Sequence, residues 1–355
     1  MNTCKSYLCL FSAMVVCYSC DLKFQETTSI IPDQRAIQVT TGPGAKSDPA
    51  WSPDGTMIAF SYQSAATNVI RRTLSGEDLQ TLGTVKEDIR NTKFDLSPDG
   101  TKFVYRSNAS DDLWVLTLES GSEFVLTPQH SDASEPAWSP DGQWVAFTAR
   151  GVTSDSRNVW VIPATGGASR KLTDTRGRDL LPSWSPDSKK IAFESIREHH
   201  NGIWVVDIES GESRQLTSDS TFNRAPDWSP DGSTIAYYST RNASTQIWTI
   251  PTNGGEETQI TSSTDATNPS WSPDGSKIAY RTSEGVWTSS VVTKEILNRS
   301  NMFENYPIWW PDVESLVGTI NAGFSNIRTF SLVDSTVSPG TEQLDGQFDS
   351  DPEWY

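Results

Sequence analysis

The side chains that could act as acids, bases or metal ligands are few in this sequence of 355 residues. It has three histidines, His130, His199 and His200, and four cysteines, all within the first 20 residues. The supply of ligands therefore excludes a zinc or copper site made of cysteine and histidine in the rest of the chain. An imidazole beside arginines would suit proton abstraction next to a carboxylate, and scattered carboxylates could hold Ca²⁺ through oxygen ligands.

The motifs that signal common catalytic machinery do not occur in the sequence. There is no G-x-S-x-G, H-E-x-x-H, P-loop or G-x-G-x-x-G pattern, so we expect no serine hydrolase, zinc peptidase or nucleotide-binding chemistry. The formal net charge of −17 disfavours nucleic acid as a partner, because phosphate binding needs a basic surface. We expect no metal site and no cofactor, with Ca²⁺ as the only candidate ion, and no catalytic residue can be assigned.

One tetrapeptide, SPDG or a variant of it, organises most of the chain. Its proline stands at positions 53, 98, 140, 186, 230, 273 and 311. In this turn the proline fixes φ, the aspartate can bond back to the backbone, and the glycine accepts a left-handed conformation. Short segments rich in residues that favour β-strands follow each turn, as in IAF, IWV and QLT. This pattern predicts four strands in each unit. A period of this length with four strands is typical of a β-propeller blade.

The predicted fold is therefore an all-β propeller of four-stranded antiparallel blades. Seven blades are expected, and the alternative is eight, with a mixed terminal blade. Residues 35–41 resemble an outer fourth strand and residues 351–355 resemble a first strand, so the two ends of the chain are expected to tie the ring. Tryptophans recur in the first and third strands. We interpret these rings as core between neighbouring blades rather than as sugar-stacking platforms.

The first 20 residues have the pattern of an export signal. Lys5 is the only charged side chain before Asp21, and an apolar stretch at 7–16 follows it; such a segment is too short to span a bilayer stably. The end of this segment, CYSC at 17–20, resembles a bacterial lipobox, which implies lipidation of Cys20. Ordinary secretion and an uncleaved, buried N-terminal helix are the alternatives. The predicted organisation is a signal peptide at 1–20, a tether at 21–34 and the propeller at 35–355.

The repeat WSPDG followed by IAF or IAY, then IWV and LT, resembles the propeller repeat of the TolB-like family, itself related to WD-repeat blades. The resemblance covers residues 35–355 and implies the propeller fold and a place in the bacterial cell envelope. TolB itself carries an α/β domain ahead of its propeller, and the 14 or so residues after Cys20 are too few for one. Because propellers host many functions, the resemblance specifies no activity.

One face of the propeller is expected to carry the binding site. Loops between second and third strands, and between successive blades, open on the side opposite the SPDG turns, and propellers bind ligands at such loops. The candidate binding residues on this face are His130, Asp132, Glu135, Arg176, Arg178, Arg197, His199, His200 and Arg224.

The sequence favours an exported, lipid-anchored, monomeric propeller that acts as a protein–protein interaction scaffold, in the periplasm or at the outer membrane. Its expected partners are envelope proteins, and it would contact a membrane only through its lipid. The alternative is a carbohydrate-binding or lyase- or hydrolase-type propeller with its site at the channel mouth, where His130, His199 and the nearby arginines would act.

Overall fold

The computed structural model describes strands at 36–38, 46–51, 58–62, 67–72 and 79–85, and a nearly continuous segment at 94–299. That segment lacks residues 131, 151–155, 198–199, 218–221, 242 and 263–264, and three strands follow at 303–309, 315–321 and 325–331. All of these belong to one compact unit, Gln34–Tyr355. The described residues form strands and turns without a helix, and so contain no apolar helix of membrane-spanning length.

The described strands fall into seven groups, which we number as blades in chain order. Blade 1 consists of β2 (Lys46–Trp51), β3 (Ile58–Tyr62), β4 (Thr67–Arg72) and β5 (Leu79–Val85). Blade 2 consists of β6 (Phe94–Leu96), β7 (Lys102–Arg106), β8 (Leu113–Thr117) and β9 (Ser122–Val125). Blade 3 consists of β10 (Ser134–Trp138), β11 (Trp144–Arg150), β12 (Arg157–Pro163) and β13 (Arg170–Lys171). Blade 4 consists of β14 (Arg178–Trp184), β15 (Lys190–Arg197), β16 (His200–Asp207) and β17 (Ser213–Gln215).

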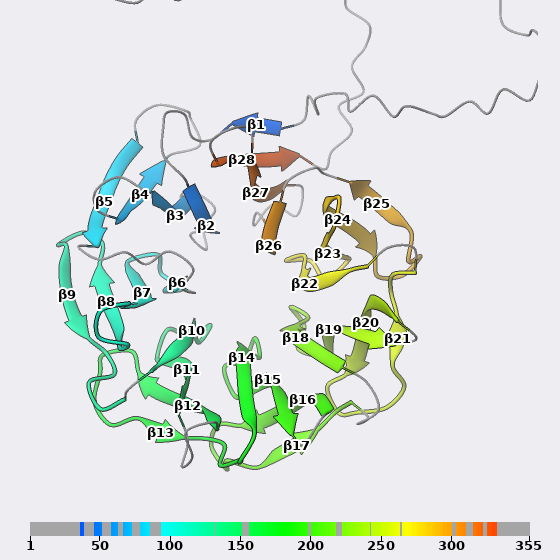
Figure 1. Cartoon of the computed structure of the whole chain (residues 1–355), viewed down its shortest axis with the longest axis horizontal. Coiled ribbons are helices and arrows are strands. Elements are labelled where there is room, and N and C mark those ends of the chain that lie inside the picture. Colours follow the sequence, from blue (N-terminus) through cyan, green and yellow to red (C-terminus); the bar gives the residue numbers. More distant parts are fainter. Residues whose placement is uncertain are drawn as a thin grey trace, which may run out of the picture. The chain divides into compact units, whose positions relative to one another are not determined.

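The remaining strands continue the same order. Blade 5 consists of β18 (Phe222–Trp228), β19 (Thr234–Arg241), β20 (Ser244–Pro251) and β21 (Thr258–Gln259). Blade 6 consists of β22 (Thr267–Trp271), β23 (Lys277–Thr282), β24 (Gly285–Ser290) and β25 (Ile296–Arg299). Blade 7 consists of β26 (Phe303–Trp309), β27 (Ser315–Asn321), β28 (Ser325–Ser331) and β1 (Ala36–Gln38). The blades follow one another around a common centre, with the first strands innermost (Figure 1).

The first strands close a circle. Each of β2, β6, β10, β14, β18, β22 and β26 contacts the next, and β26 contacts β2. The N-terminal strand β1 pairs antiparallel with β28, with Ala36 opposite Phe330. It is thus an outer fourth strand, as residues 35–41 were predicted to be, and the structure places it on the blade of β26, β27 and β28. The all-β propeller is thereby confirmed. Because residues 351–355 lie outside the described residues, the choice between seven and eight blades stays a prediction.

The SPDG turns join first to second strands and have the geometry that their residues predict. In blade 3 the Ser139 hydroxyl donates to Asp141 Oδ1 at 2.5 Å, and the same oxygen accepts from the Gln143 N–H at 3.0 Å. Gly142 closes the turn at φ 71° by donating to the Ser139 carbonyl at 2.8 Å. In blade 4 a serine, Ser188, takes the left-handed position at φ 59°. We call the side of the ring with these turns, at 97–100, 139–142, 185–188, 229–232 and 272–275, the turn face.

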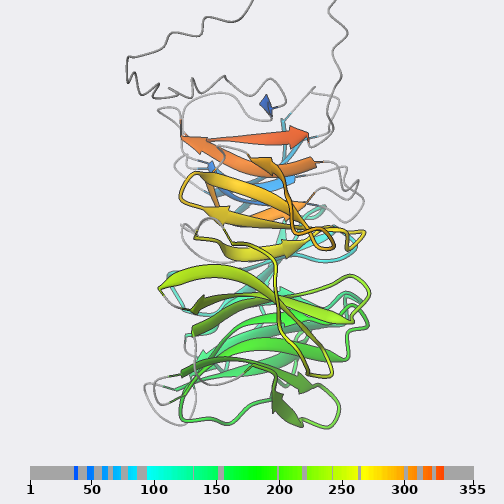
Figure 2. The ribbon, with the colours of Figure 1, turned by 90° about the vertical axis from the view of Figure 1, so that its right-hand side faces the viewer.

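The opposite side, which we call the loop face, carries the ends of second strands and the starts of first strands. Arg150, which ends β11, and Asp132, which precedes β10, belong to it. Figure 2 shows the same sheets from the side. The loops that connect the strands lie at the two ends of the strands, and the sheets are stacked one after another between these two sets of loops.

Tryptophan fills the space between blades, as interpreted from the sequence. Trp138, Trp184, Trp228, Trp271 and Trp309 end their first strands, and each is buried. Trp184 packs with Val161 of blade 3 and Phe193 of its own blade, and its Nε1 donates to the Ala137 carbonyl of blade 3 at 3.0 Å. The rings are therefore structural and fix each blade on the one before it.

Candidate functional site on the loop face

A β-bulge recurs in the first strands where they approach the loop face. In four of the P-x-W sequences the residue before the proline has a positive φ: 53° at Glu135, 53° at Leu181, 49° at Ala225 and 51° at Asn268. The pairing register with the second strand shifts at each of these points. A bulge leaves one residue out of the strand ladder and redirects its backbone and side chain, and non-glycine residues at positive φ are strained. The surrounding structure must therefore hold these positions.

Carboxylates hold two of the bulges, and in each case the carboxylate comes from the preceding blade. Glu135 Oε2 accepts from the Leu181 N–H at 2.9 Å and from the Thr148 hydroxyl at 3.1 Å. The carboxylate of Glu194 accepts from the Ala225 N–H in the same way. Glu135 reaches its bulge from a first strand, whereas Glu194 reaches its bulge from a second strand. Carboxylates at two different strand positions thus make the same kind of hydrogen bond between adjacent blades.

Asp132 is the centre of an arginine cluster between blades 2 and 3. Its Oδ1 lies 3.2 Å from Arg106 Nη2, and its Oδ2 lies 3.2 Å from Arg150 Nε and also contacts Arg157 Nη1. Burial acts to raise the pKa of Asp132, but the pull of Arg157, Arg150 and Arg106 outweighs it and holds that pKa below its usual value. Asp132 is therefore ionised at neutral pH, and the cluster is a permanent concentration of charge.

Glu194 is the centre of a second polar group, between blades 4 and 5. Its side chain is 2% exposed and its Oε1 lies 3.1 Å from Arg224 Nε. The same oxygen accepts from Asn201 Nδ2 at 3.2 Å. Arg224 also bonds to the Tyr238 hydroxyl, so an acid, a cation and a phenol lie in one row. Burial raises the pKa of Glu194 to about 7, with a further upward push from Glu135 and an opposing pull from Arg224.

His130 is held by aromatic and hydroxyl groups of blade 3. Its ring lies edge-on to Trp160 and Phe147, with centroids 4.6 Å and 5.1 Å away, and its Nε2 is 2.7 Å from Ser169 Oγ. Burial lowers the pKa of this imidazole. The histidine is thus neutral at pH 7 and packs against the third strand of its blade.

Arg197 lies against its own blade rather than over the strand ends. Its guanidinium stacks on Trp204 at 3.7 Å and its Nε donates to Ser195 Oγ at 2.9 Å. Arg241 repeats this arrangement on Trp248 at 3.8 Å. A contact that recurs from blade to blade is a structural one, a cation–π pair on the side of the sheet.

The other predicted residues are placed as follows. Arg176 and Arg178 are exposed at the start of blade 4, and the charge of Arg178 helps to lower the pKa of Glu194. His200 begins β16, with its backbone opposite that of Arg197. His199 and the predicted lipidation site Cys20 lie outside the described residues. The structure therefore brings Asp132 and Glu135 into one hydrogen-bonded network through Arg157 and Ser134, and places Arg224 in the neighbouring group.

Sequence reasoning missed Arg106, Arg157, Glu194 and Tyr238. Arg197 was a candidate because it ends a second strand, and the same position selects Arg106 equally well. Glu194 stands in the strand KIAFESIR, where a charged residue among apolar ones signals a paired buried group. The sequence gives no comparable signal for Arg157 and Tyr238, because their partners Asp132 and Arg224 stand well before them in the chain.

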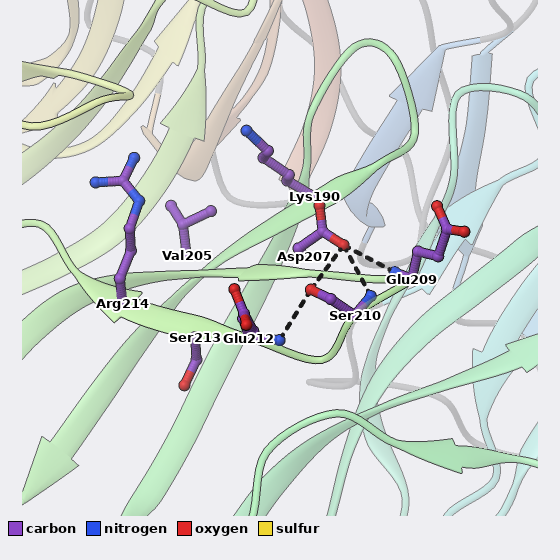
Figure 3. Close-up of a pocket in the computed structure, with 8 residues that line it drawn as sticks. All are labelled: Lys190, Val205, Asp207, Glu209, Ser210, Glu212, Ser213 and Arg214. Atoms are coloured by element: carbon purple, nitrogen blue, oxygen red, sulfur yellow. Dashed lines mark hydrogen bonds between the residues drawn. The ribbon is translucent and has the colours of Figure 1, made fainter.

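Two hollows in the described part of the chain lie away from this network. One, of about 560 Å³, is lined by Lys190, Val205, Asp207, Glu209, Ser210, Glu212, Ser213 and Arg214. Figure 3 shows that Asp207 turns back onto its own loop, where its Oδ1 accepts from the N–H groups of Glu209 and Ser210, both at 3.0 Å. The carboxylate of this hollow is therefore used by a local turn. The other hollow, of about 700 Å³, lies on the turn face around Asp99 and Asp141.

No group of three or more His, Cys, Asp or Glu side chains in the described part of the chain is arranged to hold a metal ion. The loop-face network consists of arginine–carboxylate and backbone–carboxylate contacts.

A ring of antiparallel four-stranded sheets with a polar network at one end of its first strands defines the molecule as a β-propeller. The family model described as the TolB beta propeller domain matches residues 96–292 and 197–354. The chain belongs to the TolB β-propeller family. No protein among those with curated function matches its sequence.

Solved structures show the same fold. A protein assigned as TolB in Agrobacterium tumefaciens is 25% identical, with a TM-score of 0.55, and the match covers 71% of this chain and 94% of that one. An oligogalacturonate lyase from Vibrio parahaemolyticus is 15% identical, with a TM-score of 0.69 and coverage of 84% and 94%. A puromycin-hydrolyzing peptidase from Mycobacterium tuberculosis is 16% identical, with a TM-score of 0.67 and coverage of 82% and 51%. The last two likenesses concern the fold alone.

Proposed function

We propose that this protein is an exported, lipid-anchored β-propeller that acts as a protein–protein interaction scaffold in the bacterial cell envelope, with the loop face as its docking surface. The observation that carries this proposal is the distribution of basic residues between the two faces. Second strands begin with lysine at the turn face in β7, β15 and β23, and end with arginine at the loop face in β7, β11, β15 and β19. Two of these arginines, Arg197 and Arg241, stack on tryptophans of their own blades, so Arg106 and Arg150 are the ones at the strand ends. Arginine is enriched and lysine depleted in protein interfaces.

An aromatic side chain on the loop face adds an anchor to these charges. Phe222, at the start of β18, is 54% exposed, and Arg224 follows two residues later in the same strand with 43% of its side chain exposed. Aromatic residues and arginine provide most interface hot spots. The partner that fits is a protein segment with an apolar side chain and acidic neighbours, because opposite charge guides and orients association.

The test is site-specific photo-crosslinking in intact cells, with a photoreactive phenylalanine at position 222. The matched control is position 292, because Val292 is also exposed, at 85%, but lies between β24 and β25. We expect one discrete adduct from position 222, an envelope protein by mass spectrometry, that weakens in high salt and in Arg178→Glu. Equal adducts from both positions, or none from 222, would overturn the proposal. Incorporation of labelled fatty acid that is lost in Cys20→Ala tests the anchor.

A second candidate, a carbohydrate-binding or lyase-type propeller, is favoured by the row of Glu194, Arg224 and Tyr238. A carboxyl group whose pKa is about 7 beside a cation and a phenol has the properties of a general acid or base. Its test is the turnover of acidic polysaccharides, followed by ultraviolet absorbance of unsaturated products. Turnover that is lost in Glu194→Gln and kept in His130→Ala would support this candidate, and no turnover by the native protein would reject it.

A further inference from the structure

Three arginines converge on one aspartate at the loop-face junction of blades 2 and 3. We propose that Arg106, Arg150 and Arg157 form a binding site for a multiply charged oxyanion, with Asp132 as the internal carboxylate that holds them together. This inference goes beyond the scaffold role, since the ligand is a small anion and no partner protein is needed.

The cluster is built from three separate elements. Arg106 ends β7, Arg150 ends β11 and Arg157 begins β12, while Asp132 lies in the connection before β10. Arg157 is the most fixed of the three, with 14% of its side chain exposed. Its Nη2 donates to the Asp132 carbonyl at 2.7 Å and also bonds to the Ser134 hydroxyl. One guanidinium is thus positioned in advance, which lowers the entropic cost of binding.

The positive charge of the cluster exceeds its negative charge. Three guanidinium groups contact two carboxylates, those of Asp132 and of Asp111, the latter 2.5 Å from Arg106 Nη2. Among the residues that the structure describes, one positive charge therefore lacks a counter-charge in contact with it. The buried Nε of Arg106 has no hydrogen-bond partner among the described residues, and a buried donor without a partner is costly. An added anion would supply the missing counter-charge.

The position of Arg150 makes the cluster accessible. Its side chain is 57% exposed, and it contacts Asp132 through Nε, so this contact does not use its two terminal amino groups. Such a fork binds carboxylate, phosphate and sulfate oxygens with two parallel hydrogen bonds. Asp132 stays ionised and carries a single charge, so a ligand with two or more negative charges is needed to compete for the arginines.

The test measures sulfate binding to the purified full chain by isothermal titration calorimetry, in buffers of constant ionic strength set with chloride. Sulfate stabilises many proteins without binding, so the readout is saturable heat. We expect saturable binding by the native protein, and at least tenfold weaker binding by Arg150→Gln. The matched control is Arg176→Gln, which removes an exposed arginine of the same face outside the cluster and is expected to bind as the native protein does.

A second variant separates a binding site from a purely structural cluster. Asp132→Asn removes the competing carboxylate and is expected to tighten sulfate binding severalfold, whereas a purely structural cluster would give lower thermal stability without binding. Titration with citrate distinguishes a carboxylate ligand from a tetrahedral one. Absence of saturable binding for both anions, or equal binding by native protein and Arg150→Gln, would overturn the proposal. Neither result depends on crosslinking at position 222.

Discussion

The carboxylate of Glu135 accepts a hydrogen bond from the backbone N–H of Leu181 at 2.9 Å, across the boundary between two blades. Leu181 is a bulge residue at φ 53°, so its N–H is outside the regular strand ladder. The side chain of one blade thereby completes the main-chain bonding of the next. Loop-face carboxylates are structural in this respect, whatever ligand the face binds.

Replacement of Glu135 should therefore destabilise the propeller. In Glu135→Ala the Leu181 N–H loses its acceptor, and we expect the free energy of unfolding to fall by about 1–3 kcal/mol. Glu135→Gln keeps an oxygen that can accept the bond from the Leu181 N–H, so this variant should lose less of the free energy of unfolding. Urea denaturation at pH 7 measures both, and equal losses in the two variants would contradict the assigned role of the acceptor.

Stability should depend on pH through Glu194. Its pKa of about 7 in the folded protein lies above the ordinary value of 4.5, so folding favours the protonated form. The stability associated with this shift is fully present below pH 4.5 and is lost as the pH rises to about 7. Between pH 5 and pH 8 the native protein should lose about 2 kcal/mol relative to Glu194→Gln, whose amide does not titrate.

Urea denaturation of both proteins at several pH values checks this expectation. Burial also raises the pKa of Asp227, to about 6, but this group is common to both proteins and cancels in the comparison. Parallel pH profiles for the native protein and Glu194→Gln would show that Glu194 does not titrate in this range.

Two tryptophans at equivalent positions should differ in their response to substitution. Trp184 Nε1 donates to Ala137 O at 3.0 Å, whereas the buried Nε1 of Trp138 has no partner among the described residues. The exposure of both side chains is similar, so Trp→Phe removes a comparable area from each. We expect Trp184→Phe to cost about 1 kcal/mol more than Trp138→Phe, the net value of one hydrogen bond. Urea denaturation measures both variants, and equal unfolding midpoints for Trp184→Phe and Trp138→Phe would contradict this expectation.

Ser188 provides a test on the turn face. It holds a left-handed φ of 59°, and its hydroxyl accepts from the Asp141 N–H of the preceding blade at 3.0 Å. Ser188→Ala keeps the strained backbone and loses this bond, which should cost about 1 kcal/mol. Ser188→Gly also loses the bond but relieves the strain, so it should be the more stable variant. Thermal unfolding of the pair gives the order directly.

The sequence predicts the propeller because each blade repeats the same local chemistry. SPDG specifies a turn, and the tryptophan before it marks the buried end of the first strand, as Trp184 and Trp228 show. The outer strand near the N-terminus is predicted equally well, since residues 35–41 have the pattern of a strand without its neighbours, whereas residues 351–355, the other half of the predicted tie, lie outside the described residues. These features depend on residues close together in the chain.

The candidate site is less predictable because its contacts join different blades. Asp132 and Glu135 are found from their place before a first strand, but their partners Arg106 and Leu181 lie in neighbouring repeats. Arg197 satisfies the same positional rule as Arg150 and yet stacks on Trp204. The direction of a long side chain is decided by the packing around it, and a single sequence contains no direct record of that packing.

The pairing of β1 with β28 also constrains how the protein is made. β1 precedes the other described strands in the chain, and its partner strand is complete only once residue 331 has been synthesised. Until then both strands carry unpaired backbone groups, which can pair with strands of other chains. Ring closure is therefore a late event of biosynthesis, and a chain cut short before residue 325 would be a nucleus for aggregation rather than a smaller propeller.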